Sequence, residues 1–273
     1  MVIDFHTHIF PDKIAGATIE ALSKGASITP HSDGTYNGLI SQMISTGVDI
    51  SVNLPVLTRA SQLDSIMGFA RKVNESYHEG ARIISFAGMH PDISEPEQAL
   101  ARIKDAGFLG IKLHPDYQGT FFDDEKYVRI LRCAKALDLI TVTHAGFDGA
   151  YVGQPIRCTP VRVLRALDAL GGYDKLVLAH MGGNELLDDV LENLAGENVY
   201  FDTSYVLPSM NKKMLEDMIK KHGEDKILFA TDSPWQHQGE QIKIIKACGL
   251  GKEVEDKILC QNAKKLLKLD SVL

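Results

Sequence analysis

Short apolar runs typical of β-strands alternate with amphipathic helical patterns along the 273 residues of the chain. The runs are almost continuously apolar, as expected for parallel strands that are covered on both faces. Each run is followed by a helical pattern, and a helical pattern at 253–268 ends the series. The predicted strands cover residues 1–9, 48–56, 82–90, 108–114, 139–145, 175–181, 198–204 and 226–232.

Eight strand–helix repeats in about 250 residues predict an α/β fold, a single (β/α)₈ TIM barrel with its active site at the C-terminal ends of the strands. No linker or change in composition interrupts the pattern, so we expect one domain over residues 1–273. The alternative is a doubly wound open sheet, which would spread the strand ends along a line. Only a closed barrel brings the first and the eighth strand ends together.

Histidine recurs where these apolar runs end. Six of the ten histidines lie at the end of a run or one residue from it, and an aspartate ends another run. These residues are His6, His8, His90, His114, His144, His180 and Asp232. Histidine is the commonest metal ligand, so this set would form a metal-centred active site if the fold gathers it. His222 differs because it precedes the helix-ending Gly223, where the helix dipole would favour its charged form.

The first predicted strand carries the sequence Asp-x-His-x-His. Because side chains alternate along a strand, His6 and His8 should share a face with Asp4, whereas Ile3 and Phe5 should take the other face. Such a polar series is costly to bury unless it binds something. One strand-end histidine alone is more often a hydrogen-bonded core residue, but the joint pattern favours a metal site. Histidine and carboxylate ligands suit Zn²⁺ and tolerate Mn²⁺, Fe²⁺ or Co²⁺.

The motifs DFHTHIF, GIKLHPD, TVTHAG, LAHMGG, YFDTS and FATDSPW resemble those of the amidohydrolase superfamily. The resemblance is greatest to its second family, which includes non-oxidative decarboxylases of aromatic and related acids. It spans all eight predicted strands and implies a catalytic divalent ion, with one Zn²⁺ favoured over two ions. The implied metal ligands are His6, His8, His144 and Asp232. His180 would act as an acid/base or bind a second ion, and Asp232 would accept the proton of the metal-bound water.

Lys112 has two interpretations. By alternation it shares a face with His114, and superfamily members with two metal ions carry a carboxylated lysine on strand four that bridges them. Alternatively, its ammonium group binds a carboxylate or phosphate of the substrate, which we favour slightly. We also expect His114, Tyr117 and Trp235 to line the substrate pocket.

The formal net charge of −7 and the absence of a basic run argue against binding to nucleic acid or to an anionic membrane. The four cysteines lie far apart, which is typical of reduced thiols rather than a disulfide framework. Neither a signal peptide nor a membrane span is visible. We therefore expect a cytoplasmic protein that acts on a small molecule, either as a monomer or as a homodimer.

The same metal site can support several reactions. Our first expectation is hydrolysis of an amide, lactone or related bond in a small, anionic substrate by a metal-activated water. The alternative is non-oxidative decarboxylation of an aromatic or related carboxylic acid. Further possibilities are a metal-dependent phosphoesterase or nuclease and an inactive metal-binding barrel. Phosphoesterases on related barrels usually carry a glutamate on strand three or four, where this chain has His90 and Lys112.

Overall fold

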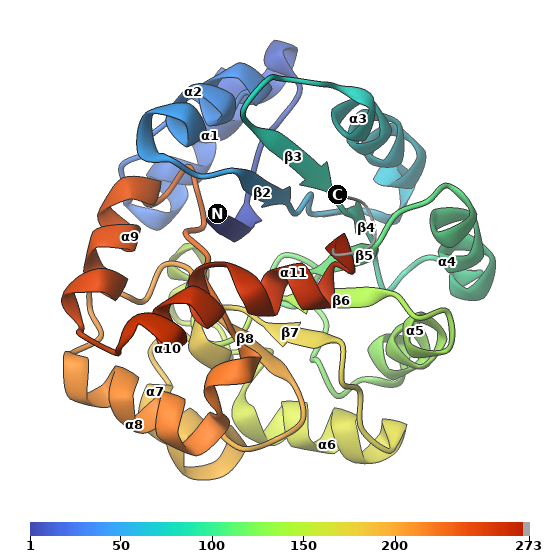
Figure 1. Ribbon diagram of the computed structural model, residues 1–273. Coiled ribbons are helices and arrows are strands. Elements are labelled where there is room, and N and C mark those ends of the chain that lie inside the picture. The colour runs from blue at the N-terminus through green and yellow to red at the C-terminus, as the bar shows by residue number, and fades with distance from the viewer. Residues whose placement is uncertain (270–273) are drawn as a thin grey trace.

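Parallel strands lie inside all the predicted apolar runs in the computed structural model, which describes residues 1–269 (Figure 1). Residues 270–273, which the sequence analysis includes in its single domain, lie outside the described residues. The strands are β1 (Ile3–Thr7), β2 (Ile50–Asn53), β3 (Arg82–Ser85), β4 (Ala87–Gly88), β5 (Gly110–Leu113), β6 (Ile140–Thr143), β7 (Leu176–Leu178), β8 (Tyr200–Asp202) and β9 (Ile227–Leu228). His6 lies near the end of β1, whereas His8, His90, His114, His144 and His180 follow their strands in the loops.

The third apolar run forms two strands because its halves pair with different neighbours. β3 pairs with β2, and β4 pairs with β5, which gives the orders β1-β2-β3 and β4-β5-β6-β7-β8-β9. At the break, the Phe86 amide donates to the Asn53 carbonyl at 3.0 Å. Farther along, the Met89 amide donates to the Lys112 carbonyl of β5 at 3.2 Å. One continuous segment thus joins the two sheets.

Backbone hydrogen bonds also join the first strand to the end of the last one. The Phe5 amide donates to the Phe229 carbonyl at 2.9 Å, and the Asp232 amide donates to the His6 carbonyl at 2.8 Å. The His8 amide donates to the Ser233 carbonyl at 2.6 Å. The strands therefore form a closed ring, which confirms the predicted TIM barrel and excludes the open sheet.

Helices surround the ring of strands (Figure 1). They are α1 (Asp12–Ala26), α2 (Tyr36–Thr46), α3 (Leu63–Glu75), α4 (Pro96–Asp105), α5 (Glu125–Ala136), α6 (Pro160–Leu170), α7 (Leu187–Asp189), α8 (Lys212–His222), α9 (Gln238–Ala247), α10 (Lys252–Asp256) and α11 (Asn262–Leu266). The predicted closing helix consists of α10, a π-helical segment (Lys257–Gln261) and α11. None of the helices in residues 1–269 is both long and apolar enough to cross a membrane.

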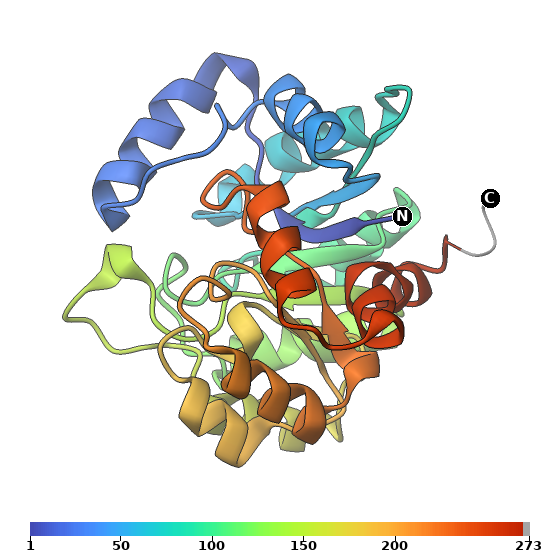
Figure 2. The ribbon, with the colours of Figure 1, turned by 60° about the vertical axis from the view of Figure 1, so that its left-hand side comes forward.

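The core has two parts. The larger cluster lies between the strands and the surrounding helices. The smaller cluster brings together side chains from several strands, among them Phe5, Val142 and Val177, and includes Leu266 of α11. Helix α11 therefore packs against the inner cluster at the end of the barrel opposite the strand-end histidines (Figure 2). This leaves the C-terminal ends of the strands open for a site.

The side chains of β1 do not alternate strictly between the two faces of the strand. The register between β1 and β2 shifts between Asp4 and Thr7, as at a β-bulge. Ile3 and Phe5 consequently join the inner cluster, although the sequence pattern places them on the face away from His6. The bulge lets Phe5 and His6 both reach the barrel interior, so the prediction that Asp4 faces inward with the histidines is wrong.

Asp4 instead links the first strand to the segment that follows the last strand, β9. Its carboxylate accepts hydrogen bonds from the Thr231 amide at 3.0 Å and the Thr231 hydroxyl at 2.6 Å. It also accepts one from Gln238 Nε2, at the start of α9, at 2.7 Å. Burial raises the pKa of this carboxyl to about 7 despite these donors. Asp4 thus supports the segment that carries Asp232.

His222, the last residue of α8, is buried in its neutral form. Its ring stacks on Phe201 with centroids 3.7 Å apart, and its Nε2 donates to the Val199 carbonyl at 3.1 Å. Its Nδ1 accepts from the Gly196 amide at 3.2 Å. Burial lowers the pKa of His222 from 6.5 to about 4. The expectation that the helix dipole favours its charged form is therefore wrong, because desolvation outweighs the dipole.

This burial predicts a pH-dependent loss of stability. Between pH 6.5 and 4 the unfolded chain protonates His222 and the folded chain does not, so the free energy of unfolding falls as the pH drops. The contribution of this group is about 3 kcal/mol at most. In urea unfolding, His222→Gln should show a shallower pH dependence than the wild type, whereas the exposed control His78→Gln should not. An unchanged slope in His222→Gln would contradict the assignment.

Candidate metal centre

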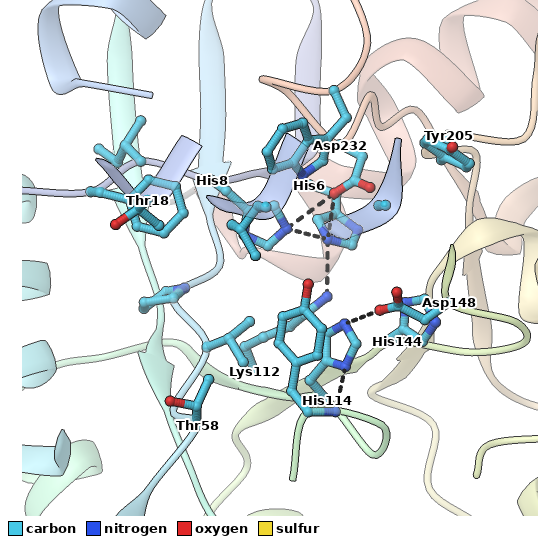
Figure 3. Close-up of a pocket in the computed structure, with 18 of the residues that line it drawn as sticks. His6, His8, Thr18, Thr58, Lys112, His114, His144, Asp148, Tyr205 and Asp232 are labelled. Carbon is cyan, nitrogen blue, oxygen red and sulfur yellow. Dashed lines mark hydrogen bonds and ion pairs between the residues drawn. The ribbon is translucent and has the colours of Figure 1, made fainter. Parts of the chain in front are cut away.

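The residues that the sequence predicts for the site all line one cavity of about 670 Å³ at the C-terminal ends of the strands (Figure 3). They are His6, His8, Lys112, His114, Tyr117, His144, His180, Asp232 and Trp235. His90 is buried but does not line this cavity. Its Nδ1 accepts from the Asp92 amide at 3.1 Å, which indicates a structural role.

His6, His8 and Asp232 form a compact set of donor atoms. The Nε2 atoms of the two histidines are 3.2 Å apart. Asp232 Oδ1 lies 3.4 Å from Nε2 of His6 and 3.0 Å from Nε2 of His8. Ligands at about 2.1 Å from one ion lie about 3.0 to 3.4 Å apart, for octahedral or tetrahedral geometry. The spacing of these three atoms therefore fits a divalent metal ion.

The opposite ring nitrogen of each histidine fixes its orientation. His6 Nδ1 donates to Asp202 Oδ2 at 2.9 Å, and His8 Nδ1 donates to the Leu54 carbonyl at 2.9 Å. Both Nε2 lone pairs are thus left toward the same point, which is the usual arrangement around metal-binding histidines. Asp202 also accepts from the His180 amide at 3.0 Å. Asp202, in the YFDTS motif, thus orients the ring of His6 and holds the backbone of His180.

The charge states of the set also suit a metal ion. Burial and the charge of Lys112 lower the pKa of His6 to about 4. Burial alone would raise the pKa of Asp232, but the charges of His6 and His8 bring it well below 3.8. At neutral pH the imidazole of His6 is therefore neutral and the carboxyl group of Asp232 is ionised. These are the forms in which both residues bind metals.

Lys112 is completely buried beside this set. Its Nζ donates to His6 Nε2 at 2.9 Å, and burial lowers its pKa to about 8. Within residues 1–269, no other lysine or arginine lines the cavity. Arg157, at the neighbouring loop, pairs instead with Asp116 at 3.3 Å. The cavity thus contains a single cationic side chain, next to the candidate metal position.

His144 belongs to a second group, with His114 and Asp148. Their potential ligand atoms lie within 4.8 Å of one another. However, the rings of His114 and His144 are stacked, with centroids 4.3 Å apart and an angle of 11° between planes. Imidazole lone pairs lie in the ring plane, so stacked rings direct them along parallel planes rather than toward one ion. This group fits a metal ion less well than the first, and the role of His144 as a ligand stays a prediction.

His180 connects the two groups. Its Nε2 lies 2.9 Å from His144 Nδ1, and its Nδ1 donates to the Ser204 carbonyl at 3.0 Å. His144 Nε2 and Asp116 Oδ2 are buried 4.0 Å apart and have no hydrogen-bond partner among the described residues. Hydrogen-bonded imidazoles of this kind can pass a proton, so His180 is placed to act as an acid or a base.

Several lining residues have a backbone conformation that is rare for residues other than glycine. The φ angles are 59° for His180, 64° for Asp232 and 67° for Tyr205. Such left-handed residues cost conformational energy and cluster at functional sites. The geometry therefore supports a functional role for the loops after β7, β8 and β9.

The remaining pocket predictions concern His114, Tyr117 and Trp235. All three line the cavity, and the rings of His114 and Tyr117 stack with centroids 4.0 Å apart. Asp148, which the sequence analysis missed, lies 3.4 Å from His114 Nε2. It follows His144 by four residues in a loop, and no motif distinguishes it from other loop aspartates. The sequence also did not predict that helix α1 would form a wall of the cavity.

Solved structures with the same fold include several enzymes. The 2,6-dihydroxybenzoate decarboxylase from Rhizobium matches with a TM-score of 0.70 and 20% identity, over 98% of this chain and 99% of that chain. A dihydroxybenzoic acid decarboxylase from Polaromonas sp. JS666, solved with manganese and the inhibitor 2-nitroresorcinol, matches with a TM-score of 0.73 and 19% identity, over 98% and 97%. A putative amidohydrolase from Staphylococcus aureus matches with a TM-score of 0.69 and 20% identity, over 98% and 99%.

At these identities the structural matches establish the fold. No protein with curated annotation matches the sequence. The model of the amidohydrolase family matches residues 3–269, which is almost the whole chain. The chain therefore belongs to the amidohydrolase family and is an enzyme of that family, as the strand-end motifs predicted.

Proposed function

We propose that this enzyme is a metal-dependent, non-oxidative decarboxylase of an aromatic or related carboxylic acid. The observation that carries the proposal is the buried ammonium group of Lys112 beside the donor set, in a cavity with otherwise largely apolar walls. A carboxylate would find one positive charge there and flat apolar surfaces for a ring. The decarboxylases among the structural matches support this reading over our first expectation of hydrolysis.

The cavity also suits the release of CO₂. The carboxylate would bind at the polar metal end, whereas the neutral CO₂ that leaves needs no charged partner and loses little beside the apolar walls. Hydrolysis instead requires space for a water molecule and stabilisation of a developing oxyanion. The apolar walls therefore fit decarboxylation better than hydrolysis.

His6, His8 and Asp232 would hold a single divalent ion, and His144 is the further predicted ligand of this ion. A bound ion would act as a Lewis acid that binds the substrate's oxygen atoms and withdraws electron density from the reacting carbon. Nitrogen and carboxylate ligands suit both Zn²⁺, which the sequence favoured, and Mn²⁺, which the Polaromonas enzyme contains. We propose one ion of either type.

The chemical step is redox-neutral. The bond between the substrate carbon and its carboxylate breaks, CO₂ leaves, and the carbon keeps the electron pair and takes up one proton. Lys112 would bind the carboxylate, and His180 would deliver the proton and recover it through His144. Asp232, as a carboxylate, can accept a proton from a substrate hydroxyl group. The proton transfer through His144 uses the hydrogen bond between His180 Nε2 and His144 Nδ1 as it stands.

This function can be tested by measuring the turnover of a panel of substrates by protein that has been loaded with Mn²⁺ or Zn²⁺. We expect CO₂ release from hydroxylated aromatic acids, and slower or no cleavage of lactones, amides and phosphoesters.

Asp232→Asn should keep the fold, as measured by circular dichroism, and should keep some bound metal. Its turnover should fall about 100- to 10,000-fold. The exposed control Asp92→Asn should match the wild type. Faster hydrolysis than CO₂ release, or near-normal turnover in Asp232→Asn, would refute the proposal.

The role of Lys112 can be separated from metal binding. Lys112→Met removes the charge and keeps a buried chain of similar length, so KM for the acid should rise about tenfold or more, as expected for loss of a charge-assisted hydrogen bond. Binding of an uncharged analogue such as the corresponding amide should change much less. If Lys112→Met loses its bound metal instead, Lys112 is a metal-bridging residue, as in the carboxylated-lysine alternative.

Asp202 should control metal affinity through His6. Asp202→Asn replaces the carboxylate that orients His6 Nδ1–H, so we expect the affinity for Mn²⁺ or Zn²⁺ to fall about 10- to 100-fold. Isothermal titration of the metal-free protein measures this directly, with Asp92→Asn as the surface control. Equal affinities in the two variants would show that Asp202 does not position a metal ligand.

A further inference from the structure

One face of helix α1 forms a wall of the cavity. Ile14, Thr18, Leu22 and Ala26 all line it, and their spacing of four residues places them on one side of the helix. The helix begins shortly after the candidate ligand His8. At 1.5 Å per residue, the stretch from Ile14 to Ala26 is about 18 Å long. The cavity therefore has a long side along α1, which we call the arm.

The segment from β2 to α3 also lines this part of the cavity. Its lining residues include Val56, Ile66 and Phe69. In Figure 3, Thr18 and Thr58 lie on the opposite side of His6 and His8 from Asp148 and Tyr205. Figure 2 shows α1 projecting beyond the open end of the barrel.

The arm is uncharged, in contrast to the metal end. Every lining residue from Ile9 to Phe69 is uncharged, and most are hydrocarbon or aromatic. The acidic and basic lining residues, such as Lys112, Asp148 and Asp232, all come from later in the chain. Ile14, which is 49% exposed, adds accessible apolar surface to the arm. The cavity thus has a polar end and an apolar arm.

The cavity is larger than a single aromatic ring requires. Its volume of about 670 Å³ lies within the range of about 300 to 1,000 Å³ that holds drug-sized ligands. A single ring with a carboxylate would fill only the metal end. The end of α1 closes this side of the cavity, because Ala26 lies next to Gly149 in the loop that also carries Asp148. A closed side suits a small-molecule chain of limited length rather than a continuing polypeptide.

We infer that the arm binds a hydrocarbon chain carried by the acid, so that the substrate class is a carboxylic acid with an extended alkyl substituent. The carboxylate would lie at Lys112 and the chain between α1 and the segment from β2 to α3. The reaction of this substrate rests on the proposed function. Binding of its chain does not, because it depends only on the shape and polarity of the arm.

The test uses the metal-loaded protein and hydroxybenzoic acids that carry a methyl, butyl or octyl group at a ring position remote from the carboxylate. Trp235 is the only tryptophan and lines the cavity, so its fluorescence reports binding. Each buried methylene should tighten binding by up to about fourfold, which corresponds to about 0.8 kcal/mol of transfer free energy. The affinity should therefore rise steeply from the methyl to the octyl compound. CO₂ release is measured in parallel.

Two neighbouring positions on α1 provide matched variants. Leu22→Arg places a charge in the arm and should abolish the gain in affinity with chain length. Ala21→Arg adds the same side chain at an exposed position outside the cavity and should keep that gain. Leu22→Met, an apolar replacement of similar size, should also keep it. Circular dichroism confirms that each variant is folded.

The outcomes separate the two proposals. The proposed binding of an alkyl chain in the arm is supported if affinity rises with chain length in the wild type and in Ala21→Arg but not in Leu22→Arg. This holds even if no CO₂ is released and the proposed reaction fails. CO₂ release without any dependence on chain length overturns the arm and leaves the reaction intact. An equal gain in affinity with chain length in Leu22→Arg and Ala21→Arg also overturns the inference about the arm, because the alkyl chain would then bind elsewhere.

Discussion

The hydrogen bonds that join the first strand to the end of the last strand create the active site. Asp232 and His6 are 226 positions apart in the sequence, yet the amide of Asp232 donates to the carbonyl of His6. This bond places the carboxylate of Asp232 against the two imidazoles. Asp4 reinforces it through Thr231, immediately before Asp232. Without closure of the barrel the donor atoms would lie at opposite edges of a sheet.

The bulge in β1 solves a packing conflict at the same place. The inner core needs the bulk of Phe5, which meets Phe86 edge-to-face at 6.0 Å. The site needs His6, the next residue, to reach Asp202 and Lys112. Regular alternation would turn one of the two away from the barrel interior. The register shift allows both, and the buried Asp4 is satisfied outside by Thr231 and Gln238.

The sequence predicts the fold and the members of the site well, because strand ends of a barrel converge whatever the loops do. All the predicted metal ligands and pocket residues accordingly line the cavity, and of the histidines at the strand ends only His90 does not. The distances between them were not predictable. The stacking of His144 on His114 depends on ring orientations, and the contact of Asp148 with His114 depends on a loop path. Hydrophobic periodicity does not encode a β-bulge, so the prediction that Asp4 faces the barrel interior was wrong. The wall formed by α1 depends on how a long connection folds back, which no local pattern indicates.

Charge at the metal end links ion binding to substrate binding. The ammonium group of Lys112 lies within hydrogen-bonding distance of His6 Nε2, at the edge of the donor set. A divalent ion held by the same atom would repel this group strongly, because the surroundings screen charge poorly. The carboxylate of Asp232 offsets only part of the combined positive charge. A substrate carboxylate near Lys112 and the ion would offset one more unit of positive charge and draw Lys112 away from His6. Each of the two ligands should therefore strengthen the binding of the other, as reciprocal coupling requires.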